Sequence, residues 1–140
     1  PFFGWAMMLL KPIAIDRDNP KAALRQVAKQ GQERLEQGIW VLIFPEGTRV
    51  PVGQPGKFSR GGTALAVNAG LPVLPIAHNA GVFWPRSGWH KHPGTIEVVI
   101  GPEMHAEGEG PRAIAELNQR AEDWINAQVT ELEARPRFHH

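Results

Sequence analysis

The chain has no cysteine among its 140 residues. Disulfide bonds, thiolate catalysis and cysteine-ligated metal sites are therefore excluded for this sequence. It also has no apolar run long enough to cross a bilayer, because the longest, residues 2–10, is about half the required length. No basic leader precedes that run and no small-residue cleavage site follows it, so no signal peptide is visible.

The chain has little net charge, with a formal value of +1 at pH 7. That is too little to indicate nucleic-acid binding by bulk electrostatics, and we expect no nucleic-acid partner. The charges are unevenly spread. Between Lys11 and Arg60 basic residues outnumber acidic ones by 9 to 5, whereas between Gly101 and Arg135 acidic residues outnumber basic ones by 8 to 3. The acidic part is typical of a solvated terminal helix.

The chain begins at Pro1, inside an apolar segment and without a methionine. We therefore expect it to be part of a longer protein. A length of 140 residues suits one domain with a buried core. We assign that domain to residues 1–135 and treat 136–140 as a disordered tail. For the apolar residues 2–10 core packing is favoured, with contact to a membrane as the alternative.

Helix-like and strand-like segments alternate, which predicts an α/β fold. Asn19 and Pro20 predict the start of a helix, with Asn19 as its N-cap, and Gly38 follows its end. Short strands are expected before and after this helix, at 13–15 and 39–44. Two strands joined by a helix pair in parallel, so we expect a mostly parallel sheet flanked by helices. Further along we expect a helix at 62–70, strands at 71–78 and 95–100, and a last helix from Pro111. The apolar residues of this last helix form one stripe that we expect to pack in the core: Ile114, Leu117, Ala121, Trp124, Ile125, Val129 and Leu132.

The segment around which the chain is organised is the expected strand 39–44 and the turn that follows it. The strand is an almost continuous apolar run, typical of burial on both faces, and Pro45 ends it because proline cannot donate to a sheet. Ligands of open α/β sheets bind at the carboxyl ends of the strands. There Gly47 allows close approach of the backbone, and Arg49 can hold a phosphate through two parallel hydrogen bonds. The alternative is a tight turn with a solvated arginine.

Residues 44–49 read Phe-Pro-Glu-Gly-Thr-Arg and resemble the motif of the glycerolipid acyltransferase family, in particular of bacterial 1-acyl-sn-glycerol-3-phosphate (lysophosphatidic acid) acyltransferases. Two weaker matches support the resemblance. The Ile-x-Ile-Asp-Arg segment of the family is matched at 13–17, and its Val-Pro-Val-x-Pro motif at 71–75, with Leu71 in place of valine. The resemblance extends from Pro1 to about Leu132 and implies a glycerolipid acyltransferase-like fold that is truncated at its N-terminus.

The resemblance implies a site for the phosphate of the substrate, formed by Arg17, Glu46, Gly47, Thr48 and Arg49. The two arginines would neutralise the phosphate, while the Gly47 amide and the Thr48 hydroxyl would donate hydrogen bonds to it. Glu46 would either orient an arginine or shape the turn.

A second implied site is a pocket for the acyl chain, bordered by Leu71, Pro72, Val73 and Pro75. Without the resemblance, these residues indicate only a strand of the core, interrupted by its prolines.

The implied activity is transfer of an acyl group to the sn-2 hydroxyl of 1-acyl-glycerol-3-phosphate, which gives phosphatidic acid for phospholipid biosynthesis. Acyl-carrier protein or acyl-CoA would be the co-substrate, and no cofactor is expected. The enzyme would work at the cytoplasmic face of the inner membrane, either peripherally or anchored by a missing N-terminal segment.

Acyl transfer to an alcohol needs a base for the attacking hydroxyl and donors for the oxyanion. The family supplies the base with a His-x-x-x-x-Asp motif, which is not present in these 140 residues. His92 and Glu97 have the required spacing, but the acid is glutamate, Pro93 and Gly94 intervene, and the pair follows the phosphate motif instead of preceding it. The resemblance places the true pair before Pro1, so this chain alone is expected to be inactive.

Other binding motifs are weak. A P-loop is rejected, because Pro51 replaces its first glycine and Phe58 its Ser or Thr. We expect nearby Lys57 and Arg60 to be solvated, with contact to an anion as the alternative. His78 is interpreted as structural, and no metal site is expected.

We expect residues 81–92 to form a loop, which is rich in aromatic and basic side chains and suits either a membrane interface or a packed surface.

Two other functions remain open. The first is a non-catalytic module that binds anionic lipid or phosphate and never carried the base. The second is an acyltransferase of the same family with another acceptor, such as glycerol-3-phosphate or a lysolipid headgroup.

Overall fold

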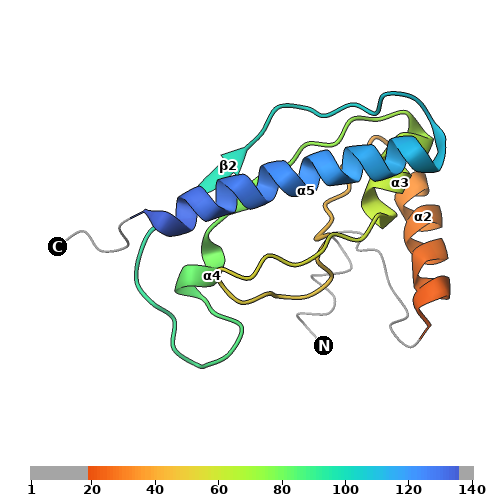
Figure 1. Cartoon of the computed structure of the whole chain (residues 1–140). Helices are drawn as coiled ribbons and strands as arrows, with labels where there is room; N and C mark the ends of the chain where they lie inside the picture. The colour runs from red at the N-terminus through yellow and green to blue at the C-terminus, as the bar shows by residue number, and fades with distance from the viewer. Residues whose placement is uncertain (1–18, 136–140) are drawn as a thin grey trace. The chain divides into compact units, whose positions relative to one another are not determined.

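The computed structural model describes residues 19–135 (Figure 1). The chain divides into two compact units, Pro1–Ile43 and Phe44–His140, and each is described by itself. The strand expected at 13–15 and the tail expected at 136–140 lie outside the described residues. The assignment of residues 1–135 to a single domain stays a prediction.

In the first unit, helix α2 spans Pro20–Glu36, as the capping residues predict. The side chain of Asn19 accepts a hydrogen bond from the Ala22 amide at 3.2 Å, which satisfies one free donor of the first turn. The helix ends where Gly38 takes the left-handed conformation with φ of 73°, a conformation that glycine adopts without a steric penalty. The predicted boundaries of this helix are confirmed.

Residues 39–44, which follow α2, form neither helix nor strand in the structure. Trp40 and Leu42 are 84% and 71% exposed, so the burial expected on both faces is not found. A strand is defined by hydrogen bonds to a neighbour, and the expected neighbour at 13–15 lies outside the described residues. Parallel pairing of these two segments therefore stays a prediction.

Within residues 19–135 there is a single sheet, in the second unit, and it is antiparallel. It pairs β1, Ile76–His78, with β2, Val98–Ile100, in a register that sets Ala77 opposite Val99. Both strands are shorter than the predicted 71–78 and 95–100. Strand β1 begins only after Pro75, because proline has no amide to donate to the sheet. Beyond it the pairing continues only as an isolated bridge between Val73 and Met104. This pair thus departs from the expected mostly parallel sheet.

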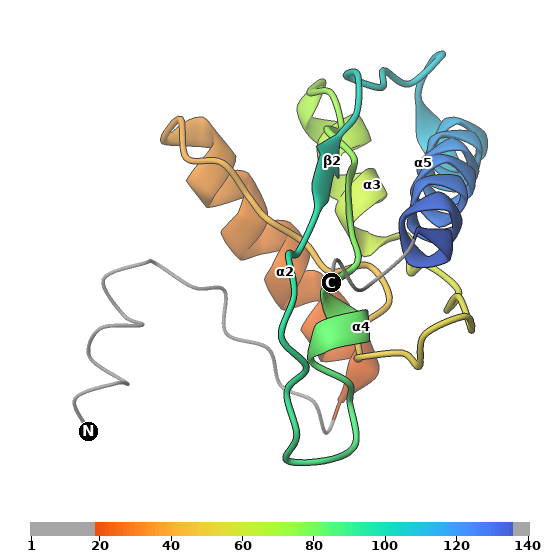
Figure 2. The same cartoon turned by 90° about the vertical axis from the view of Figure 1, so that its left-hand side faces the viewer.

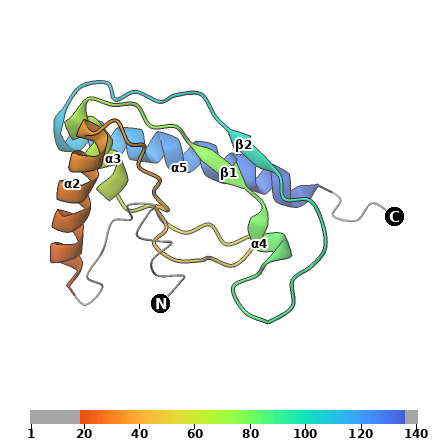
Figure 3. The same cartoon turned by 180° about the vertical axis from the view of Figure 1, so that it is seen from behind.

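Three helices complete the second unit as far as residue 135 (Figures 1 and 3). They are α3, Gly61–Ala69, α4, Ala80–Phe83, and α5, Gly110–Ala134. Helix α3 agrees with the predicted helix and is closed by Gly70 in the left-handed conformation. Within the described residues no helix is both long and apolar enough to cross a membrane.

Helix α5 packs against both α3 and β1 and contributes more buried apolar residues than any other described element. The apolar stripe predicted for this helix is confirmed, since Leu117 and Leu132 are 0% and 2% exposed. Ala77 contributes the inner side of β1 and is 1% exposed. The outer side of the two strands faces solvent, since Val98 and Ile100 are 57% and 63% exposed.

A buried polar contact fixes α3 against α5. The Thr63 hydroxyl donates to the Asn118 side-chain oxygen at 2.8 Å, and the Asn118 amide donates to the Phe58 carbonyl at 3.4 Å. Thr63, Asn118 and Phe58 are all buried. Buried polar groups are costly unless they are paired, so this contact specifies how the two helices meet.

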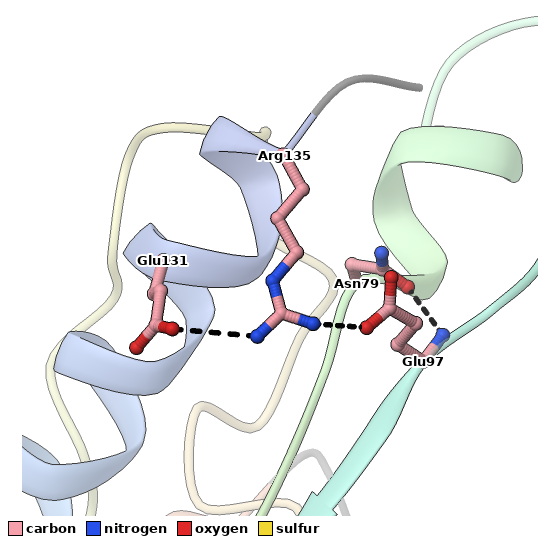
Figure 4. Close-up of polar contacts among 4 residues, drawn as sticks. All are labelled: Asn79, Glu97, Glu131 and Arg135. Carbon is pink, nitrogen blue, oxygen red and sulfur yellow. Dashed lines mark hydrogen bonds and ion pairs between the residues drawn. The ribbon is translucent and has the colours of Figure 1, made fainter. Parts of the chain in front are cut away.

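The far end of α5 is tied to β2 through Arg135 (Figure 4). Its guanidinium pairs with the Glu97 carboxylate and, at 3.3 Å, with Glu131 one turn earlier in the helix. Glu97 also donates its amide to the Asn79 side chain at 2.9 Å. These ion pairs are exposed and contribute little to stability, but they set where the strand begins relative to the helix.

Replacement of Thr63 by valine should destabilise the protein by about 1–3 kcal/mol, because the buried Asn118 oxygen loses its donor. Thr130→Val is the matched control, since the Thr130 hydroxyl donates to the Asn126 carbonyl at 2.8 Å in an exposed part of α5. That change should cost about 0.5 kcal/mol or less. Urea unfolding of both variants measures the difference, and equal losses would contradict the assigned role of the buried contact.

Replacement of Gly101 by alanine should also destabilise, by about 1–3 kcal/mol, through overpacking. A methyl group there would lie 2.7 Å from the Trp124 ring and 2.9 Å from Pro75. Gly81→Ala is the control, because its methyl group would meet only Val52, at an ordinary 3.6 Å. Thermal unfolding should show a lower Tm for Gly101→Ala only, and an unchanged Tm would show that the Trp124 ring moves aside freely.

Candidate functional site

The turn at residues 44–49 is built around Gly47. Its φ of 68° lies in the left-handed region, which favours glycine. Its amide donates to the Phe44 carbonyl at 3.0 Å and so closes the turn that follows Pro45. This is the amide that the family resemblance assigns to the substrate phosphate, and here it has an internal acceptor. Thr48, the second expected donor, is exposed on the same turn.

Glu46 shapes the loop beside the turn. Its carboxylate accepts a hydrogen bond from the Gly56 amide at 3.3 Å, and a side chain at Gly56 would collide with that carboxylate. The Ser59 amide donates to the Pro45 carbonyl at 2.8 Å and fixes the other end of the loop. Of the two roles expected for Glu46, these contacts match the shaping of the turn.

Arg49 reaches across to a segment 35 residues further along the chain. Its guanidinium donates to the Trp84 carbonyl at 2.8 Å and to the Pro85 carbonyl at 3.5 Å. It also lies over the Trp84 ring, 5.4 Å from the ring centroid. Carbonyl oxygens orient the guanidinium without neutralising it, and no carboxylate of the described residues pairs with Arg49. Its positive charge therefore remains available to an anion.

A second cation lies on the same ring. The Lys91 ammonium is 4.2 Å from the centroid of Trp84, so it lies within about 10 Å of the Arg49 guanidinium. That separation is close to the screening length of physiological salt, so the two charges act together on a nearby anion. Trp84 itself is 53% exposed. The site thus combines an oriented arginine, a lysine and a half-exposed indole.

Sequence reasoning missed Trp84 and Lys91 as neighbours of the motif. It recognised the aromatic and basic character of residues 81–92 but had no signal that pairs them with a turn so distant in the chain. The other expected phosphate ligand, Arg17, lies outside the described residues. Lys57 and Arg60 are exposed.

The residues expected to border the acyl chain are divided by their burial. Leu71 and Pro72 are exposed and Val73 is half-buried, whereas Pro75 is fully buried in the core. Pro75 faces Gly101, whose amide donates to the Pro75 carbonyl at 2.9 Å. Leu71, Pro72 and Val73 thus keep surface that an acyl chain could contact, while Pro75 supports them from within.

Two histidines considered from the sequence, His78 and His92, contact the backbone of neighbouring residues. The Nδ1 atom of His78 accepts the Ala80 amide at 3.2 Å, in agreement with its interpretation as a structural residue. His92 donates its backbone amide to the Phe83 carbonyl at 2.8 Å, and the Glu97 carboxylate of the rejected pair forms its ion pair with Arg135. Over residues 19–135, no three side chains of His, Asp or Glu come together as a metal site.

Known proteins resemble this chain over most of its length. The acyltransferase family model matches residues 1–79. A 1-acyl-sn-glycerol-3-phosphate acyltransferase of Pseudomonas aeruginosa is 77% identical over 132 residues, which cover 94% of this chain and 51% of the relative. The human 1-acyl-sn-glycerol-3-phosphate acyltransferase alpha is 32% identical over 118 residues, with 84% of this chain and 42% of the relative covered.

The fold is similar to a solved structure of the same kind. The crystal structure of the 1-acyl-sn-glycerophosphate acyltransferase of Thermotoga maritima superposes with a TM-score of 0.77 at 29% identity and covers 99% of this chain and 54% of that one. The chain spans about half the length of the curated relatives it matches. The resemblance of its Phe-Pro-Glu-Gly-Thr-Arg turn to this family is confirmed, and the chain belongs to the acyltransferase family.

Proposed function

We propose that the intact enzyme transfers an acyl group to the sn-2 hydroxyl of 1-acyl-glycerol-3-phosphate and so makes phosphatidic acid. The observation that carries the proposal is the un-neutralised Arg49, held by two carbonyl oxygens in a turn with the family motif. The 77% identical relative, whose name states this reaction, supports the choice of acceptor.

The phosphate of the acceptor would bind to Arg49. A phosphate dianion needs several donors and positive charge, and a guanidinium offers both in a planar fork. Thr48 would add its hydroxyl from the same turn, and Lys91 would add charge from across the Trp84 ring. Arg17 is assigned to the same phosphate by the family resemblance alone. Glu46 and Gly47 would hold the turn in shape, and the Gly47 amide would reach the phosphate if its contact with Phe44 opens.

The acyl chain would contact Leu71, Pro72 and Val73, with Pro75 behind them. The donor would be acyl-carrier protein or acyl-CoA, and the chemistry needs no cofactor. The histidine base and its aspartate would stand in the half of the relatives' length that this chain does not span.

Residues 13–15 and 39–44 would pair as parallel strands, as the strand–helix–strand order predicts. The enzyme would work at the cytoplasmic face of the inner membrane, as the family resemblance implies.

Removal of the Arg49 side chain should weaken binding of the acceptor. A charge-assisted hydrogen bond to a phosphate contributes about 1.5–3 kcal/mol, so Arg49→Ala should raise KM for lysophosphatidic acid on the order of 10- to 100-fold. The assay needs a protein of full family length, such as a chimera in which this chain replaces the matching half of the Pseudomonas aeruginosa relative. Arg112→Ala, which removes an exposed cation from the first turn of α5, should leave KM unchanged.

The same chimera separates the proposed function from its alternatives. An unchanged KM for Arg49→Ala would contradict the phosphate assignment. Competition by glycerol-3-phosphate or by another lysolipid at lower concentration than lysophosphatidic acid would indicate a different acceptor. Vesicle binding without turnover of any acceptor would indicate a non-catalytic binding module.

A further inference from the structure

The chain between α4 and β2 forms a loop that is closed at its base. The His92 amide donates to the Phe83 carbonyl at 2.8 Å, which brings the two ends of residues 84–91 together. Phe83 is buried, and Gly94 packs so closely against its ring that a methyl group there would collide with it. Figures 1 and 2 show the loop leaving α4 and running away from the sheet before it returns to β2. A compact loop with a packed base can present its tip as a rigid surface.

The tip of this loop carries a tryptophan that contacts almost nothing. Trp89 is 100% exposed. A large amphipathic ring gains free energy wherever it leaves water for an interface that is apolar on one side and wet on the other. Arg86, His90, Lys91 and His92 around it are also exposed. Indole rings flanked by cations are typical of surfaces that lie in the headgroup region of a bilayer.

The sign of the charge around the loop points to the chemistry of its partner. No Asp or Glu occurs between Gly47 and Ile96, a stretch of 50 residues that contains five Lys and Arg residues. Glu97, the first acid after it, is paired with Arg135 at the base of β2. A loop that carries cations and no carboxylate of its own is attracted to anionic lipids.

From these observations we propose that residues 84–92, the tryptophan loop, dock onto an anionic bilayer surface. Trp89 would lie at headgroup level, while Arg86 and Lys91 would contact lipid phosphates. The inference rests on the proposed function in one respect, because a lipid acceptor is what brings the chain to a bilayer. Arg49 donates to the Trp84 and Pro85 carbonyls at the start of the loop, so the docking surface and the phosphate-binding turn are directly joined. An acceptor headgroup at the membrane surface would therefore lie close to Arg49.

Brominated lipids test the position of Trp89, because bromine quenches only indoles at its own depth in the bilayer. The full-length chimera is mixed with vesicles of brominated phosphatidylethanolamine and phosphatidylglycerol. The difference in quenching between wild type and Trp89→Phe isolates this residue from the other tryptophans. Trp89→Ala should lower the partition constant on anionic vesicles by roughly tenfold or more, since it removes the one indole at the tip. It should leave the urea midpoint unchanged, because the side chain is fully exposed.

A charge-matched pair of variants tests the electrostatic part. Arg86→Ala with Lys91→Ala should reduce partition by on the order of tenfold and flatten its dependence on salt. Arg25→Ala with Arg112→Ala removes the same charge from exposed positions on α2 and α5 and should have a much smaller effect. Equal losses in the two pairs would overturn the proposed contact of Arg86 and Lys91 with lipid.

Acyl transfer separates failure of this inference from failure of the proposed function. Trp89→Ala should raise KM for lysophosphatidic acid presented in vesicles but not for the monomeric lipid, whereas Arg49→Ala should raise both. If Trp89→Ala binds vesicles with the same partition constant as the wild type, the docking loop is overturned and the proposed function is unaffected. If Trp89→Ala loses partition onto vesicles but the wild-type chimera transfers no acyl group, the docking loop is supported and the proposed function is overturned. Shielding of Trp89 from aqueous iodide in the absence of vesicles would show that protein covers it, and would also overturn the inference.

Discussion

The second unit depends on the packing of one long helix against a small set of partners. Helix α5 buries Leu117 completely and meets α3 through the hydrogen bond between Thr63 and Asn118. Apolar contacts alone allow two helices to slide or rotate at little cost, but a buried hydroxyl and amide must meet at one position. The other end of α5 meets β2 through Arg135. The helix is thereby fixed at both ends, and the loops between β1 and β2 start from a rigid base.

Arg49 is held by neutral groups, and this determines what it can bind. An arginine held by a carboxylate would have its charge largely compensated, and a substrate phosphate would have to displace that acid. Arg49 is held instead by main-chain carbonyls and the face of an indole, which orient the guanidinium and leave its charge in place. Preorganisation of this kind lowers the entropy lost when the anion binds. The same contacts connect the turn to the loop that carries Trp89.

The sequence was informative where local chemistry decides the structure. Asn19 and Pro20 marked the start of α2, Gly70 the end of α3, and the stripe from Leu117 to Leu132 the buried side of α5. The motif of residues 44–49 identified the family because six adjacent residue types form a specific pattern. The sheet was less predictable, since Pro75 shortened β1 and an apolar run alone does not reveal its neighbour. The contact of Arg49 with Trp84 depends on tertiary packing and left no trace in the sequence.

The base of the tryptophan loop has a consequence for how this surface can change. Gly94 cannot gain a side chain without moving the buried Phe83 ring, and the His92 amide must reach the Phe83 carbonyl. The tip is under no such restriction, because Trp89 and its neighbours contribute almost nothing to the core. The base of the loop is therefore constrained in sequence, whereas its tip is free to vary. Its tip can be redesigned or grafted to suit another surface, while the fold and the turn that holds Arg49 remain as they are.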